Sequence, residues 1–188
     1  MARRPLTRQR ILRAALRLID RDGLDALSMR KLGATLGVEG MALYRHVGSK
    51  GRLLEGVTEL LLEELDIPPA DSAPWVDAWH AIARSYRRLA RSHPGAFPLL
   101  ALSPLTTAAR FKRAQAPLSI LRDAGFSETD AQRAFRTLLS YADGYLLREL
   151  ADGDGELTPE EADAAFDFGI RAILTGLQQE LRAAGPPP

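Results

Sequence analysis

The chain contains no cysteine, and this absence excludes several kinds of chemistry. Without thiols the protein has no disulfide framework, no thiolate metal site and no cysteine nucleophile. Apolar runs are also short, because an arginine, aspartate or glutamate interrupts each of them before it reaches the roughly 18 residues that a membrane span requires. An amphipathic pattern follows residues 1–5 in place of the apolar core of a signal peptide. We therefore expect a cytoplasmic protein that does not enter the membrane.

Catalytic and metal-binding patterns are missing from the sequence as well. It shows no Ser-His-Asp, phosphate-loop or metal-ligand arrangement, and His80 and His93 stand thirteen residues apart without a carboxylate at ligand spacing. The Asp-Gly-Asp-Gly run at 152–155 lacks the remainder of a calcium-binding loop. The sequence thus predicts a protein that is not an enzyme and that uses no metal or cofactor.

The formal net charge is only +1, but the charges are unevenly distributed. Residues 1–50 carry 11 Lys and Arg against 4 Asp and Glu, a balance of +7, whereas residues 51–188 carry 14 against 20, a balance of −6. A basic segment joined to an acidic body suits a module that binds DNA, since phosphate neutralisation is the main nonspecific source of affinity. On charge alone, the alternative is that the basic segment is a solvated charged surface that binds no partner. For Arg3 and Arg4, before the first helix, we favour a solubilising tail over a minor-groove arm.

Apolar residues recur at spacings of three and four through the chain, which is typical of amphipathic helices. Since no strand-like alternation of useful length occurs, the sequence predicts a globular all-α fold of about nine helices. Ser127 and Thr158 each begin a capping box, whereas Pro117 predicts a kink or a division into two shorter helices. We expect a short helical turn or irregular connection at 97–105, and helices at 7–22, 28–36, 40–47, 50–65, 75–92 and 107–124 and from 127 and 158 onward.

Two short helical segments stand close together near the N-terminus. Residues 28–36, a turn at Gly37 and residues 40–47 give two helices within about twenty residues. DNA sequence is read by a helix in the major groove that a second helix braces against the backbone. The pattern favours a DNA-binding helix-turn-helix, although helical hairpins also occur in other proteins. The apolar residues available as its shared core are Leu32, Leu36, Val38, Leu43 and Val47.

The residues themselves resemble the DNA-binding segment of the TetR family. The matching marks, in the family's order and spacing, are Leu36-Gly37-Val38, Leu43-Tyr44-x-His46 and Ser49-Lys50 with Leu53-Leu54. The first helix also fits through Ala14-Ala15 and Asp22-Gly23-Leu24, so the resemblance covers roughly residues 7–57. Beyond residue 57 only the arrangement of the predicted helices matches, and this arrangement is similar to that of the tetracycline repressor. Gly33 stands where the family usually has Ala, and Val47 where most members, though not the tetracycline-repressor branch, have Phe.

The resemblance implies which residues meet double-stranded DNA. Tyr44, His46 and Lys50 match positions that contact phosphates, and Arg30 matches a position that reaches a base edge, where a guanidinium suits guanine. The other predicted DNA-binding residues are Ser28, Gly40, Met41, Ala42 and Arg45, with Met41 and Ala42 suited to thymine methyl groups. Simpler alternatives are a core position for Tyr44, a solvated helix end for His46, and ordinary surface charges for Arg45 and Lys50.

The resemblance also implies two domains, a helix-turn-helix DNA-binding domain at 1–50 and a ligand-binding and dimerisation domain at 51–188. In this family the C-terminal helices enclose a small-molecule effector, and the helix at 50–65 is the expected lever between the domains. The residues that suit an unidentified, partly aromatic effector are Trp79, His80, Tyr86, Phe97, Phe111, Tyr141 and Tyr145. The alternative for these residues is a place in the hydrophobic core, because aromatic residues at helical spacing often belong to one.

In the resembling family the last two helices pack against those of a second copy. The apolar residues that suit such a dimer interface are Phe135, Leu138, Ala142, Leu146, Phe166, Ile170, Ile173 and Leu177. A homodimer would place two recognition helices about one DNA turn apart and would therefore read a palindromic operator. An intramolecular core is the alternative use of these residues.

Together these features predict a repressor that a small-molecule effector releases from its operator. Effector and DNA would favour different spacings of the two DNA-binding heads, so that each weakens the binding of the other. The alternative is a DNA-binding activator or architectural regulator without an effector. A repressor with an effector should be stabilised against unfolding by some class of compound, whereas a regulator without an effector should be stabilised by none.

Overall fold

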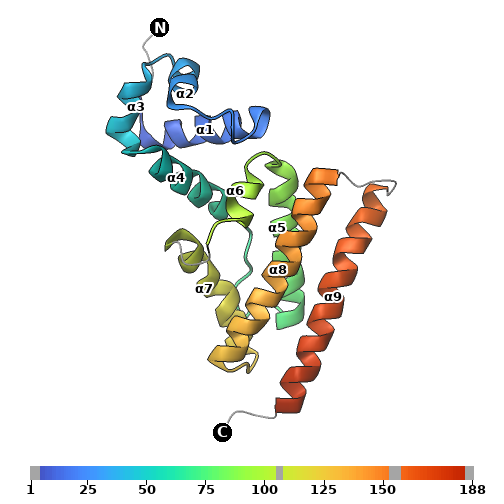
Figure 1. Cartoon of the computed structure of the whole chain (residues 1–188). Coiled ribbons are helices and arrows are strands. Elements are labelled where there is room, and N and C mark those ends of the chain that lie inside the picture. The colour runs from blue at the N-terminus through green and yellow to red at the C-terminus, as the bar shows by residue number, and fades with distance from the viewer. Residues whose placement is uncertain (1–4, 105–107, 153–157, 185–188) are drawn as a thin grey trace. The chain divides into compact units, whose positions relative to one another are not determined.

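The computed structural model describes residues 5–104, 108–152 and 158–184, which form helices and no strand (Figure 1). Arg3, Arg4 and most of the polar turn at 152–156 lie outside the described residues. The predicted all-α fold of about nine helices is confirmed. No helix in the described ranges is long and apolar enough to cross a bilayer. The helices are α1 (Arg8–Asp22), α2 (Met29–Leu36), α3 (Gly40–Val47), α4 (Lys50–Glu63), α5 (Trp75–Ser92), α6 (Phe97–Ala101), α7 (Ala108–Asp123), α8 (Glu128–Asp152) and α9 (Pro159–Ala184).

Side-chain caps begin the helices at the residues that the sequence indicates. The hydroxyl oxygens of Thr7, Ser28 and Ser49 each accept a hydrogen bond from the backbone N–H three residues later, at 3.1–3.2 Å. At the start of α9, the N–H of Thr158 donates to the Glu161 carboxylate at 2.8 Å, while the Thr158 hydroxyl accepts from the Glu161 N–H at 3.3 Å. This reciprocal pair is the predicted capping box.

Helix α7 runs without interruption from Ala108 to Asp123 although Pro117 lies inside it, so the predicted division into two shorter helices is wrong. Proline removes one N–H from the helical ladder. The side chain of Pro117 is buried beside those of Leu118 and Leu121, and this apolar packing offsets the lost hydrogen bond. Helix α6 has only five residues, in agreement with the expected short turn.

The chain gathers into two compact units. The first unit comprises residues 1–64 and 93–110, and the second comprises residues 65–92 and 111–188. The first unit thus holds α1–α4, α6 and the beginning of α7, and the second holds α5, most of α7, α8 and α9. The boundary expected after residue 50 separates DNA binding from ligand binding and dimerisation, and this functional division stays a prediction.

In the first unit, α1 packs against α2 and α4, and α4 packs against α6. The fully buried side chains of Ile19, Leu32 and Leu53 come from α1, α2 and α4 and form the centre of its core. The loop before α6 also lies directly against α1, because a Cβ atom on Gly95 would overlap the carbonyl oxygen of Ile19. The unit therefore joins the helix-turn-helix to α4 and α6.

In the second unit, α5 packs against both α8 and α9. Trp79 meets Phe135 and Tyr86 meets Asp143, so residue numbers rise together and α5 runs parallel to α8. Arg84 and Arg87 meet residues of α9 in the opposite order, Asp167 and Asp163, so α5 runs antiparallel to α9. Helix α5 therefore carries one face toward each of the two long C-terminal helices.

Candidate functional site

Helices α2 and α3 and the turn between them form a closely packed helix-turn-helix. Gly37 ends α2 in the left-handed conformation, with φ 69° and ψ 33°. A Cβ atom on Gly33 would lie 2.7 Å from the carbonyl oxygen of Val38, and one on Gly40 would lie 3.0 Å from that of Met29. The backbone thus leaves no room for a methyl group at position 33, which explains why Gly stands there in place of the usual Ala.

The inward side of this helix-turn-helix is apolar and its outward side carries the predicted DNA-binding residues. Leu32, Leu43 and Val47 are buried. The side chain of Tyr44 is 38% exposed, which excludes the core alternative for it, and that of Met41 is 73% exposed. Gly40 and Ala42 are half-buried, and the exposed predicted residues are Ser28, Arg30, Met41, Tyr44, Arg45, His46 and Lys50.

The cations of this outward side are free to meet an external anion. Within the described ranges, Arg30, Arg45 and Lys50 take part in no ion pair or side-chain hydrogen bond. Ser28 differs, because its hydroxyl oxygen already accepts the N–H of Lys31 as the cap of α2. The structure thus brings these cations together on α2, α3 and the first residue of α4, while their contact with DNA stays a prediction.

Asp22, at the end of α1, is neutralised by residues other than Arg30. Its carboxylate pairs with Arg21 and with Nζ of Lys31, both at 2.8 Å. Hydrogen bonds from Arg21 and from Lys31 hold the pKa of Asp22 far below its usual range. Since Lys31 belongs to α2, this pair connects α2 to α1 and leaves the guanidinium of Arg30 unpaired.

A second polar cluster of the first unit holds the ends of α1 and α4 beside the loop that precedes α6. His93 contacts the Asp20 carboxylate through Nδ1 at 2.7 Å and the Glu64 carboxylate through Nε2 at 2.9 Å. The N–H of Ala96 donates to the other oxygen of Asp20 at 3.1 Å. Burial lowers the pKa of His93, but its hydrogen bonds to Asp20 and Glu64 outweigh burial and leave the pKa raised. Sequence reasoning missed this cluster, because its members lie far apart along the chain.

The predicted effector residues do not form one group. Trp79 and Tyr86 are buried on the side of α5 that faces α8. Tyr141 and Tyr145 belong to the seam between α8 and α9, where their hydroxyl groups donate to backbone carbonyls of α9 at 3.2 and 3.4 Å. Phe97 is fully buried in the first unit, which makes it a core residue there.

The other two predicted effector residues, His80 and Phe111, lie near the surface of the second unit. The side chain of Phe111 is 63% exposed. His80 lines a hollow of about 520 Å³ together with Arg84, Arg88 and Arg171, so this hollow is charged and not aromatic. Burial lowers the pKa of His80, against the opposing effect of Asp167. Among the residues that the structure describes, no cluster of three histidines or carboxylates is arranged to hold a metal ion.

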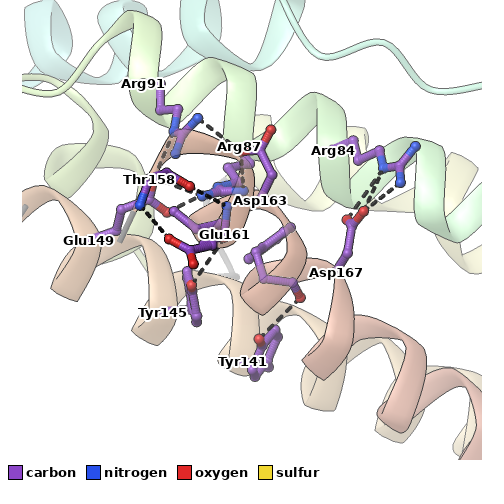
Figure 2. A network of polar contacts seen from close by, with 12 residues as sticks. Arg84, Arg87, Arg91, Tyr141, Tyr145, Glu149, Thr158, Glu161, Asp163 and Asp167 are labelled. Carbon is purple, nitrogen blue, oxygen red and sulfur yellow. Dashed lines mark hydrogen bonds and ion pairs between the residues drawn. The ribbon is translucent and has the colours of Figure 1, made fainter. Parts of the chain in front are cut away.

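A buried ion cluster joins α5, α8 and α9 (Figure 2). The guanidinium of Arg87 donates to the Glu149 carboxylate at 3.0 and 3.2 Å and to Asp163 at 2.7 Å. Arg91 contacts the same two carboxylates at 2.7 and 3.0 Å, and Arg87 also lies over the ring of Phe166, 5.2 Å from its centre. Only 6% of the Arg87 side chain and 8% of the Glu149 side chain are exposed. No sequence pattern indicated this cluster, which fixes both C-terminal helices to α5.

Most residues predicted for the dimer interface are already covered within the single chain. Leu138, Ala142, Leu146, Phe166 and Ile170 are buried. Phe135, Ile173 and Leu177 are half-buried and keep some surface. The large exposed apolar side chain of α9 is instead Phe168, which is 68% exposed and was not predicted. The interface itself stays a prediction.

Comparison with known families finds two matches along the chain. Residues 11–57 match the family model described as bacterial regulatory proteins, tetR family. Residues 79–173 match the model for a tetracyclin repressor-like C-terminal domain. The first match covers α2 and α3 with most of α1 and the first half of α4, and the second runs from α5 into the first part of α9.

Similar individual proteins cover nearly the whole chain. The tetracycline repressor protein class A from transposon 1721 of Escherichia coli is 33% identical, over 89% of this chain and 88% of that protein. The structure of the TetR family protein ActR of Streptomyces coelicolor in complex with (S)-DNPA has a TM-score of 0.79 at 26% identity, over 96% of this chain and 100% of that one. The structure of BioQ with its natural double-stranded DNA operator has a TM-score of 0.76 at 25% identity, over 92% and 98%.

Proposed function

Because the chain belongs to the tetR family of bacterial regulatory proteins and is a transcriptional regulator, we propose that it is a repressor that a small-molecule effector releases from its operator. The observation that carries this proposal is the exposed set of unpaired cations on α2, α3 and the start of α4. As a regulator that binds DNA, it acts in the cytoplasm. The similar tetracycline repressor and operator-bound BioQ support the same conclusion.

The outward residues of α2 and α3 divide the work of DNA recognition. Arg30 reads a guanine, since its guanidinium is unpaired and offers two parallel donors to the paired acceptors of that base. Tyr44, His46 and Lys50 bind phosphates and set the register of α3 in the major groove. Met41, at 73% exposure, contacts apolar groups such as thymine methyls.

A homodimer supplies the second DNA-binding head, and α8 and α9 form its interface. The exposed ring of Phe168 supports this assignment, because a large apolar side chain on a long helix gains by burial against a second copy. A twofold dimer reads the same half-site twice, so the operator is palindromic with half-sites about one DNA turn apart.

An effector that binds the C-terminal helices favours a spacing of the two heads that does not fit the operator. Support comes from the structural similarity to ActR, which was solved with a bound small molecule. By linkage, operator and effector each weaken the binding of the other. If the protein were instead an architectural regulator, no compound would raise its thermal stability.

The first experiment measures binding of the purified protein to the DNA beside its own gene, at a stated salt concentration, with footprinting in parallel. We expect a protected palindrome for the wild type and loss of protection for the double variant Arg30→Ala with Tyr44→Ala. Lys112→Ala, which removes an exposed cation from α7, is the matched control and should bind like the wild type. Failure of the wild type to select any sequence from genomic DNA would refute the proposal.

A further inference from the structure

His93 lies between two carboxylates in a geometry that requires its ring to be charged. Nδ1 is 2.7 Å from a carboxylate oxygen of Asp20, and Nε2 is 2.9 Å from one of Glu64. Ionised carboxylates only accept hydrogen bonds, so both ring nitrogens must donate, and only the imidazolium carries a proton on each. The other oxygen of Asp20 accepts the N–H of Ala96 at 3.1 Å, which is also the role of an ionised carboxylate. The bridge Asp20–His93–Glu64, called the His93 bridge below, therefore belongs to protonated His93.

The charged groups that act on His93 come from the ends of α1 and α4. Asp20 lies in the last turn of α1, and Glu64 directly follows α4. Helix α6 contains no charged residue, and Arg91 of α5 contacts carboxylates of α8 and α9. Burial lowers the pKa of His93, but the hydrogen bonds to Asp20 and Glu64 outweigh it and leave the pKa raised. The bridge is thus complete below the ordinary pKa of about 6.5 and is lost as the pH rises through the higher value.

Loss of the proton breaks one arm of the bridge and keeps the other. A neutral imidazole has one N–H donor and one nitrogen lone pair. The Asp20 arm is the shorter one, and the side chain of Asp20 is 21% exposed against 48% for that of Glu64. The remaining proton therefore stays on Nδ1, and the lone pair of Nε2 faces the Glu64 carboxylate, which repels it. The loop itself stays on α1, because Phe97 is fully buried and Gly95 lies against the backbone of α1. Deprotonation thus releases Glu64, at the end of α4.

The His93 bridge lies where the chain passes between the two units. The first unit extends to Glu64 and resumes at His93, and the residues between them belong to the second unit. The Nε2 arm thus joins the point at which the chain leaves the first unit to the point at which it returns. Helix α5 ends at Ser92, directly before His93, and α4 begins at Lys50, a predicted phosphate contact. The bridge therefore restrains both connections where they join the unit that holds the helix-turn-helix.

We infer that the His93 bridge is a pH-sensitive latch, whose protonated form holds the end of α4 to α1 in the arrangement that fits the operator, so that loss of the proton weakens operator binding. This inference rests on the proposed function, because it describes how the binding of the same operator is regulated. By linkage, the operator in turn favours the protonated form of His93 by the same factor. The latch belongs to the first unit, apart from the C-terminal helices that are proposed to bind the effector.

The test measures binding of the protein to a labelled duplex of the DNA beside its own gene, at constant ionic strength, from about pH 6 to about pH 8. We expect the affinity to fall by about threefold to tenfold over this range, since a charge-assisted but partly exposed hydrogen bond is lost. Glu64→Gln should remove this fall, because its amide N–H can donate to the lone pair of the neutral imidazole. Glu63→Gln, which removes the exposed carboxylate one residue earlier, is the matched control and should keep the fall.

The other histidines need a control, because His46 is a predicted phosphate contact and also titrates in this range. The comparison is therefore repeated with His46→Gln as the parent protein, in which Glu64→Gln should remove the same share of the pH dependence. The protonation state is measured directly by nitrogen NMR of the three imidazole rings, with His93→Gln and His46→Gln as assignments. Both ring nitrogens of His93 should carry protons at about pH 6.

The outcomes separate the latch from the proposed function. Sequence-specific binding whose pH dependence is the same in the wild type and in Glu64→Gln would overturn the inference alone. A neutral His93 ring at about pH 6 would overturn it as well. Absence of sequence-specific binding by the wild type throughout the pH range would refute the proposed function, and the latch with it. Because Glu64 is exposed, Glu64→Gln should fold even if the half-buried His93 tolerates no substitution.

Discussion

Replacing Arg87 with methionine tests whether the buried ion cluster holds α5, α8 and α9 together. Removing one partner of a buried ion pair costs about 3–5 kcal/mol, because the remaining charge is left in a poorly solvated site. In this cluster Arg91 still contacts Glu149, and Asp163 is 62% exposed and can be solvated. We therefore expect Arg87→Met to lower the free energy of unfolding by about 3 kcal/mol, the lower end of that range.

The experiment is urea unfolding followed by circular dichroism, at one fixed protein concentration because the stability of a dimer depends on it. The matched control is Arg133→Met, which breaks an exposed pair with Asp130 in which the arginine side chain is 75% exposed. That change should cost less than about 0.5 kcal/mol. The double variant Arg87→Met with Glu149→Met removes both charges and should recover part of the loss.

Two results would refute this reasoning. The first is a loss for Arg87→Met no larger than that for Arg133→Met, which would mean that water solvates the cluster. The second is a double variant less stable than Arg87→Met alone, because Glu149 would then not be the charge left uncompensated.

Three further predictions concern the dimer, the His93 cluster and the helix-turn-helix. Phe168→Asp should shift the sedimentation of the protein from dimer to monomer, whereas Phe111→Asp, at a similarly exposed ring, should not. Because the folded state raises the pKa of His93, the stabilisation from its cluster is present below the unfolded pKa of about 6.5 and is lost as pH rises through the higher folded value. Unfolding curves from about pH 6 to about pH 8 should thus show a larger loss for the wild type than for His93→Gln. Gly33→Ala should weaken operator binding, while Gly51→Ala, whose added methyl meets nothing closer than 3.7 Å, should not.

The fold could be predicted because its signals are local. A capping hydroxyl and the N–H that it binds lie three residues apart, so Thr7, Ser28 and Ser49 mark helix starts in the sequence itself. Pro117 shows the limit of such signals. Its effect on the helix depends on the burial of its neighbours, which comes from distant parts of the chain.

The polar clusters could not be predicted, because each depends on residues that only the fold brings together. Arg87 is separated from Asp163 by 76 positions, and His93 from Asp20 by 73. Nothing in the local sequence distinguishes the buried Arg87 from the exposed Arg88 beside it on α5. For the same reason nothing local in the sequence marks Arg113, although its Nε is buried.

The apolar residues of α9 show why a sequence identifies a packing stripe more readily than its partner. Ala162, Phe166, Ile170 and Leu174 recur every four residues and are all buried within the chain. Phe168 lies two positions beyond Phe166, about 200° around the helix, and is 68% exposed. The buried side is covered by α5 and α8, whereas the ring of Phe168 is left largely uncovered by its own chain. A second copy of the chain therefore gains most from contact with the side that carries Phe168, which is why this residue and not the buried stripe is the critical test of dimerisation.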